Sequence, residues 1–568
     1  MPKEQIDFAG DFPDFAELDF STEGERNLLS LAEEVSENVV SRKEAHTTAE
    51  SLLVFQEEMH KQQSISAYHT LTKYIQGSEP SIKASVKQEL LPREVEISQA
   101  KAIVYKAIAT YSYEEMSGSA EDLDLWSRSW RWKQFESPVD SKLFLVEKRL
   151  IQRLRALCPP LNYFKAQAPR LNVAWDSRRA IDARRELLFH FVSYLKKAAE
   201  QREKLAIALL VVRREIAKQA GFPNFSDYHE ARRGKRSFAR ADERQFVRHF
   251  KQIFDPVYLA VQDLREQRWG RALRRFEDVF LISPQGQVPL QVSPEESALL
   301  LRKVIGQILG EEHFLSNLMD KHYLSLQSDI RQKWGESSCN LSYLPASFLM
   351  LSLDDKYSSM PQVFLDCGRA LADISTMLNY RSLGASNQDA FSKHLSAYSF
   401  LFLAVPHLPE FYEGNAETAY DYAWTLEAIK ALVDLSAYCF EDTLYSMQES
   451  YSSSRIIEVF RSCLAEYIPQ SDISEAEEEL LYLLWPYFLS KYSNAYSSLA
   501  QVMAMMSILA EQPQRRSSNL LFAKLNAYLV TNPGSAIEER LTTAELLNPL
   551  LPQTMNKAAF ALADILAL

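Results

Sequence analysis

The sequence predicts an almost all-α protein with one minor short β hairpin. Apolar residues recur at spacings of three and four over most of the chain, as in Leu28, Leu29, Leu31 and Ala32, which places them on one face of a helix. Only 15 of the 568 residues are glycine, which argues against glycine-rich loops and β sandwiches. A hydrophobic fraction of 46% beside 24% charged residues is typical of a globular protein with a large core.

The helical pattern begins near Glu25 and continues to about Pro160, with a break at residues 77–80, and predicts an antiparallel array of helices. A long helical stretch then follows from about Arg178 to Gln219. It ends at Gly221, which suits the position just past a helix C-terminus, and at Pro223, which cannot continue a helix.

One segment favours extended structure. Between Asn340 and Leu353, leucine, tyrosine, phenylalanine and methionine crowd together, and we expect a short strand or hairpin there. After Pro361 the helical pattern returns almost to the end of the chain. No period of 20 to 50 residues recurs, so a solenoid of repeats is not indicated.

Charge and apolar runs limit the partners that we expect. The net charge of −12, from 63 basic and 75 acidic residues, argues against nucleic acid as a partner. The longest apolar run, Leu205–Val212, is too short to cross a bilayer, so membrane insertion is not expected. The first residues lack the basic end and apolar run of a secretory signal, which indicates a cytoplasmic protein. Five scattered cysteines without a CxxC pair are expected to be reduced and buried.

Four sequence blocks carry a resemblance to a known family. Residues 213–228, RREIAKQAGFPNFSDY, are similar to a family segment R-x-x-(L/I)-A-x-x-A-G-F-x-N-Y-x-D-Y. Residues 335–345 resemble a K-x-G-G-Y-C loop with both glycines replaced, and residues 361–371 fall where the family has T-L-x-H-E-x-G-H-A. Residues 483–495 look like its late V-P-F-Y-Y-I-E-Y-G-x-A helix. Over about residues 150 to 568 the chain thus resembles the thimet oligopeptidase and oligoendopeptidase F family of zinc metallopeptidases.

The resemblance implies a two-lobed helical clam-shell with a central channel, like that of oligoendopeptidase F. Residues 1–190 would form an N-terminal helical lobe. Residues 191–568 would form the catalytic-like lobe, with the zinc helix near residues 361–372.

The zinc motif itself is degenerate. A zinc helix uses H-E-x-x-H because side chains four residues apart share one helical face. The corresponding residues here are Leu365, Asp366 and Arg369. A leucine has no lone pair, and a guanidinium has only donors and repels a dication. The resemblance places Lys393 at the third ligand position, and it places Asp442 where the family has a histidine that assists substrate binding. We therefore predict that zinc and other cofactors are absent and that none of these residues is catalytic.

Arg369 and Lys393 allow two interpretations. They could place positive charge where the family holds its metal ion, in balance with Asp366 and nearby acids. Alternatively, they could bind an anion such as the C-terminal carboxylate of a peptide. Tyr487 and Tyr492 match tyrosines that bind substrate in the family, and they are the other two candidate ligand-binding residues.

The predicted function is that of an inactive oligoendopeptidase F-like protein, a pseudopeptidase that binds a peptide or a protein partner. The alternative is an active cytoplasmic oligopeptidase that hydrolyses short peptides through a displaced or misaligned metal site. The sequence leaves open the oligomeric state and the identity of the ligand.

Overall fold

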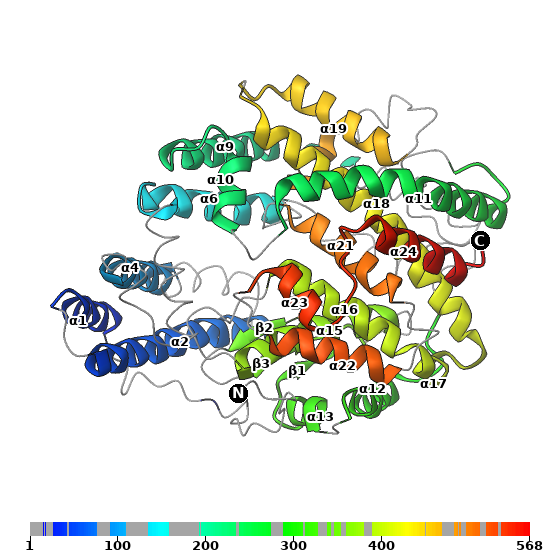
Figure 1. The fold of residues 1–568 in the computed structure, drawn as a ribbon, viewed down its shortest axis with the longest axis horizontal. Helices are drawn as coiled ribbons and strands as arrows, with labels where there is room; N and C mark the ends of the chain where they lie inside the picture. Colours follow the sequence, from blue (N-terminus) through cyan, green and yellow to red (C-terminus); the bar gives the residue numbers. More distant parts are fainter. Residues whose placement is uncertain are drawn as a thin grey trace.

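The computed structural model describes residues 15, 18, 27–41, 45–76, 91–108, 135–157, 192–193, 195–233, 238–273, 288–310, 313–327, 338–341, 346–353, 359–379, 389–448, 450–468, 482–486, 488–489, 496–511, 518–531 and 535–568. These residues are predominantly helical, as the sequence predicts (Figure 1). No described helix combines the length and the hydropathy that crossing a membrane requires.

The helices fall into an N-terminal, a middle and a C-terminal set along the chain. The first set is α1 (Leu28–Val40), α2 (Ala45–Gln76), α4 (Leu91–Ile108), α6 (Ser141–Leu157), α9 (Ala199–Gln219), α10 (Phe225–Arg233) and α11 (Arg240–Trp269). The second is α12 (Pro294–Leu309), α13 (His313–Asp320), α15 (Met360–Asn379), α16 (Ala390–Leu403), α17 (Pro409–Tyr412) and α18 (Ala416–Ser446). The third is α19 (Ser453–Tyr467), α21 (Ser497–Ala510), α22 (Ser518–Val530), α23 (Ile537–Thr543) and α24 (Pro552–Ile565).

A small sheet accompanies these helices. Strands β2 (Ser338–Leu341) and β3 (Ala346–Met350) pair antiparallel, with Cys339 opposite Phe348, which confirms the predicted hairpin. A third strand, β1 (Leu324–Ser325), pairs parallel with β3, and its two residues are too few to show an alternating pattern in the sequence. Strand β2 contacts both α2 and α15, so the sheet lies beside α15, the helix that contains residues 365–369 (Figure 1).

The predicted end of α9 is confirmed. Gly221 adopts a left-handed conformation with φ +83°, which glycine reaches without strain. The amide of Phe222 donates to the carbonyl of Ala217 at 2.9 Å, and that of Gly221 donates to the carbonyl of Lys218 at 3.0 Å. This closure turns the chain into α10. The predicted start of the helical stretch, near Arg178, lies outside the described residues.

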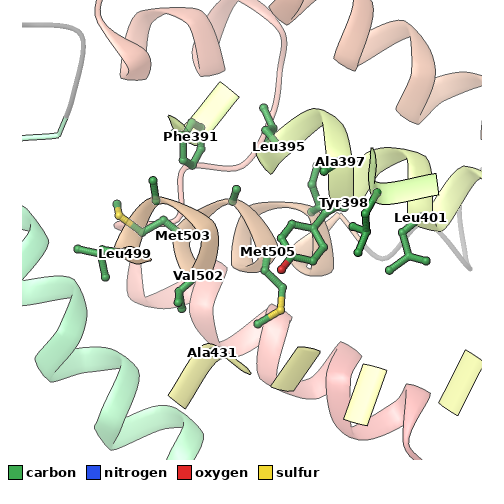
Figure 2. Close-up of a cluster of buried hydrophobic side chains, with 14 of the residues drawn as sticks. Phe391, Leu395, Ala397, Tyr398, Leu401, Ala431, Leu499, Val502, Met503 and Met505 are labelled. Carbon is green, nitrogen blue, oxygen red and sulfur yellow. The ribbon is translucent and has the colours of Figure 1, made fainter. Parts of the chain in front are cut away.

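The described helices pack around two hydrophobic cores. Helices α1, α2 and α4 share a small core that includes Leu28, Phe55 and Val104. A much larger core begins with Phe15 and with Leu71 of α2 and extends along the chain to Leu566, just past α24. Its centre includes α16, which packs between α15 and α21. Figure 2 shows Leu395 and Tyr398 of α16 beside Met503 and Met505 of α21, with Ala431 of α18 below them.

Candidate functional site

Helix α15 carries three charged side chains on one face, those of Asp366, Arg369 and Asp373. Their spacing of three and four residues places them in successive turns of the same face. Asp366 and Asp373 are only 1% and 3% exposed. Leu365, one residue before this series, packs in the large core. A leucine side chain therefore fills a core position where the resemblance implies a metal ligand.

Each buried aspartate of this face is paired with a cation. Arg369 Nη1 donates to Oδ1 of Asp366 at 2.7 Å, within the same helix. Lys393 Nζ, from α16, donates to Oδ2 of Asp373 at 3.0 Å and thereby links the two helices. Ser338 of β2 also donates to Asp373, at 3.4 Å. A carboxylate buried without a partner would cost several kcal/mol, so these pairs are what allows two acids in the core.

The backbones of α15 and α16 approach each other closely at Gly368. A Cβ atom on Gly368 would lie 2.5 Å from the carbonyl oxygen of Ser396 and 2.7 Å from Cα of Ala397. Both distances are too short for any side chain. Glycine at this position therefore sets the distance between the two helices that carry the ion pairs.

A third buried acid, Glu427 of α18, also lies near Arg369. Lys430 Nζ donates to its Oε1 at 2.6 Å, and the Tyr398 hydroxyl donates to its Oε2 at 2.8 Å. Gln501 of α21 in turn donates to the Tyr398 oxygen at 3.2 Å. Burial alone would raise the pKa of Glu427, but Lys430, Tyr398 and Arg369 together bring it below its ordinary value. Glu427 is therefore a carboxylate at neutral pH.

His394 lies next to Lys393 on α16. Burial, together with the positive charges of Arg369 and Lys393, lowers the pKa of His394 well below its ordinary value. Its imidazole is therefore neutral at neutral pH, and Nδ1 is buried without a hydrogen bond. A neutral imidazole can bind a metal, but this one has two cations as neighbours.

The residues on this face do not fit the zinc ion that the fold resemblance implies. Leu365 offers no donor atom, Arg369 and Lys393 offer only positive charge, and Asp366 and Asp373 are already bound to those cations. Among the described residues, no group of three or more histidine, cysteine, aspartate or glutamate side chains could hold a metal ion.

The structure brings together only part of the predicted site. Asp366, Arg369 and Lys393 lie in one neighbourhood, whereas Leu365 belongs to the core. Asp442 lies farther along α18, where it accepts hydrogen bonds from Arg240 and Arg244 of α11. Tyr487 and Tyr492 lie outside the described residues.

Two residues of the site were missed by the sequence analysis, Asp373 and Glu427. Asp373 had a usable signal, because it follows Arg369 by four residues and so shares its face of α15. Glu427 had none, because only the packing of α18 beside α16 brings it near.

Cys367 is buried among apolar residues, 1% exposed, as predicted. Burial, with a smaller contribution from the charge of Asp366, raises the pKa of its thiol. A thiol that stays protonated is a poor nucleophile. The geometry thus favours a structural role for Cys367.

No protein-family model and no curated protein matches this chain. Solved structures do match its fold. PZ peptidase A, solved with an inhibitor, is similar with a TM-score of 0.85 at 14% identity, over 97% of this chain and 99% of its own. A protein assigned as an oligoendopeptidase F is similar with a TM-score of 0.83 at 14% identity, over 98% of this chain and 99% of its own.

Oligoendopeptidase-F from Enterococcus faecium is similar with a TM-score of 0.50 at 11% identity, over 96% of this chain and 99% of its own. Identities of this size show a common fold and nothing about activity. The chain therefore has the helical fold of PZ peptidase A and oligoendopeptidase F, as the resemblance in its sequence implies.

Proposed function

We propose that this protein is a pseudopeptidase, a chain with the oligoendopeptidase F fold that binds a peptide or a protein partner without hydrolysing it. The ligand would occupy the channel that the resemblance implies between an N-terminal lobe of residues 1–190 and a second lobe of residues 191–568. The free thiols of Cys367, Cys439 and Cys463 agree with the cytoplasmic location that is part of the proposal.

One observation supports the proposal most strongly. On α15 and α16, where the resemblance implies a zinc ion, the structure has two ion pairs, Arg369–Asp366 and Lys393–Asp373. Zinc-dependent hydrolysis needs the ion because the ion lowers the pKa of bound water from about 15.7 to about 7. Two fixed cations provide charge but no open coordination position for water. The arrangement therefore suits electrostatic binding better than hydrolysis.

Arg369 and Lys393 are the proposed anchors for an anionic group of the ligand. Their side chains remain 22% and 31% exposed although both are paired. In the described part of the chain, Arg369 donates through Nη1 alone, which leaves other guanidinium N–H groups for a carboxylate. Tyr487 and Tyr492 complete the proposed set by their resemblance to family tyrosines. A peptide C-terminus has the chemistry that such a site would recognise.

The first test combines metal analysis with peptide cleavage. The purified protein is dialysed against zinc, its zinc content is measured, and it is incubated with a mixed library of quenched peptides. We expect neither bound zinc nor cleavage. Stoichiometric zinc with cleavage would contradict the proposal and favour the alternative, an oligopeptidase with its metal site elsewhere.

The second test addresses the anchors. Binding of a peptide pool with free C-termini is compared with binding of the same pool amidated at its C-termini. We expect Arg369→Gln to weaken binding of the free peptides about tenfold, which corresponds to one lost charge-assisted hydrogen bond. Arg369→Lys, which keeps the charge, is the matched control. Equal affinity of Arg369→Gln and the unaltered protein would contradict a role of Arg369 in binding.

A further inference from the structure

A second buried acid of α18, Glu441, lies in a different environment. Glu441 is 1% exposed. The backbone amide of Tyr496 donates to its Oε2 at 2.8 Å. Its other oxygen, Oε1, is buried and has no hydrogen-bond partner. In the described part of the chain, no cation lies within ion-pair distance of either oxygen.

Two buried arginines lie nearby, but both are engaged by other groups. Arg213 of α9 donates to Oε1 of Glu147 at 2.7 Å and also to the Tyr445 hydroxyl. Arg240 of α11 donates from Nε to Oδ1 of Asp442 at 3.1 Å. Their charges therefore reach Glu441 only from a distance.

The tyrosines and the histidine around Glu441 are uncharged. Burial raises the pKa values of the Tyr438 and Tyr445 hydroxyls, so both stay protonated. Burial and the neighbouring arginines lower the pKa of His229 on α10, so its imidazole is neutral. Tyr496 is likewise buried, with a raised pKa. Among the described residues, the titratable groups in this region include these four, the paired cations Arg213 and Arg240, and their carboxylate partners Glu147 and Asp442, with Glu243 at the Tyr438 hydroxyl.

The partner of Glu441 is an unusual backbone position. Tyr496 adopts the left-handed conformation, with φ +65°, although it is not glycine. This conformation costs a residue with a side chain about 1 kcal/mol. The Cζ atom of Arg240 lies 3.7 Å from the centroid of the Tyr496 ring, and the centroids of the Tyr496 and His229 rings are 5.2 Å apart. The turn starts α21, which is buried in the large core. The hydrogen bond from Tyr496 to Glu441 thus holds the start of a core helix.

We propose that Glu441 is a proton switch for this turn. With its proton, Glu441 closes the junction of α18 and α21 as a neutral, hydrogen-bonded group. Without its proton, it leaves a buried negative charge with one unsatisfied oxygen. The turn at Tyr496 then loosens, because admitting water to Oε1 relieves that cost. This inference does not depend on peptide binding.

The pKa of Glu441 lies near neutral pH, where such a switch requires it. Burial raises the pKa of Glu441 to about 7, and the Tyr496 amide, Arg213 and Arg240 only partly offset that rise. The pKa in the folded state then exceeds the ordinary value of 4.5, so the folded protein binds this proton more tightly than the unfolded chain does. The stability that the proton provides is present at low pH and declines as the pH rises from about 4.5 to about 7.

The test uses Glu441→Gln, which keeps an acceptor for the Tyr496 amide and cannot ionise. Unfolding constants from denaturant titrations are compared at about pH 5.5 and about pH 8.5. Relative to the variant, the unfolding constant of the unaltered protein should rise about 30-fold over that interval. Glu427→Gln is the matched control on the same helix. The ratio of the unfolding constants of the unaltered protein and this control should stay constant between the two pH values. A constant ratio for Glu441→Gln would overturn the proposal.

Hydrogen exchange tests the loosening of the turn directly. After correction for intrinsic rates, the amide of Tyr496 should exchange faster at about pH 8.5 than at about pH 5.5 in the unaltered protein. The glutamine variant should show no such difference. Equal protection at both pH values in the unaltered protein would overturn the switch. If the glutamine variant fails to fold, Glu441→Met provides the same comparison.

Discussion

Helix α18 presents two buried glutamates in opposite electrostatic situations. Glu427, near α15 and α16, is bonded to Lys430 and Tyr398, and its pKa lies below the ordinary value. Glu441, about 21 Å farther along the helix, has cations near but none in contact, and its pKa is raised. Between these two acids, direct contact with a cation accounts for the opposite directions of the pKa shifts.

The same contrast separates two regions of the molecule. On α15, and on α18 where it lies near α16, the buried carboxylates of Asp366, Asp373 and Glu427 are each bonded to a lysine or an arginine. Around α9, α11 and α18, the described carboxylate of Glu441 lacks this contact. The structure of the first region should stay the same as the pH passes through neutrality, whereas that of the second region should change.

The largest expected effect comes from breaking the first region sterically. Gly368→Ala would place a methyl group 2.5 Å from the Ser396 carbonyl oxygen and force α15 and α16 apart. We expect a loss of about 3 kcal/mol of unfolding free energy, the cost of overpacking a rigid core. Denaturant titration measures it.

Gly414→Ala is the matched control for this prediction. A Cβ atom on Gly414 meets nothing within 4 Å. Its unfolding free energy should stay within about 0.5 kcal/mol of the unaltered protein. Equal stability of the two alanine variants would show that the helices can separate at little cost.

A smaller effect is expected from Glu427→Gln, which removes the charge of the glutamate that is bonded to a cation. Losing the charge that Lys430 and Tyr398 stabilise should cost about 2 kcal/mol at pH 7, less than a fully buried pair because Lys430 is 32% exposed. Because the pKa of Glu427 is lowered, its contribution is present above pH 4.5 and is lost as the pH falls through the folded-state value. Thermal melts of both proteins from pH 3 to pH 8 test this. If the difference in melting temperature between the two proteins grows at acid pH, the lowered pKa of Glu427 is contradicted.

The smallest expected effect is that of a chelator. If ion pairs hold α15 and α16 together without a metal, then adding EDTA should leave the melting temperature unchanged. Melting the protein with and without EDTA, before and after dialysis against zinc, measures this. A drop of several degrees with EDTA would indicate that a metal ion, and not the ion pairs alone, stabilises the protein.

The sequence predicted the fold better than the site. The helical periodicity, the closure at Gly221 and the hairpin before α15 are local features, and all three are found in the structure. Strand β1 was missed because two residues that pair with a distant strand leave no local pattern.

The site depends on contacts between helices, which the sequence shows only in part. The motif at 365–369 could be located by resemblance, but the partner of Lys393 could not, because Asp373 meets it only where α15 and α16 cross. Glu427 and Glu441 are both glutamates in apolar stretches of α18. Lys430, three residues after Glu427 on the same helix, is the one local signal that separates them. Their other neighbours come from α9, α11 and α16 and could not be predicted from the sequence.

The ion pairs on α15 also bear on how such a sequence can change over generations. Placing histidines at 365 and 369 would put an imidazole into the core position of Leu365 and take the guanidinium from Asp366, while Lys393 would still repel a metal ion. Each single step would be destabilising before any metal could bind. Building a zinc site here would require several substitutions at once, which makes such a site hard to reach by stepwise mutation.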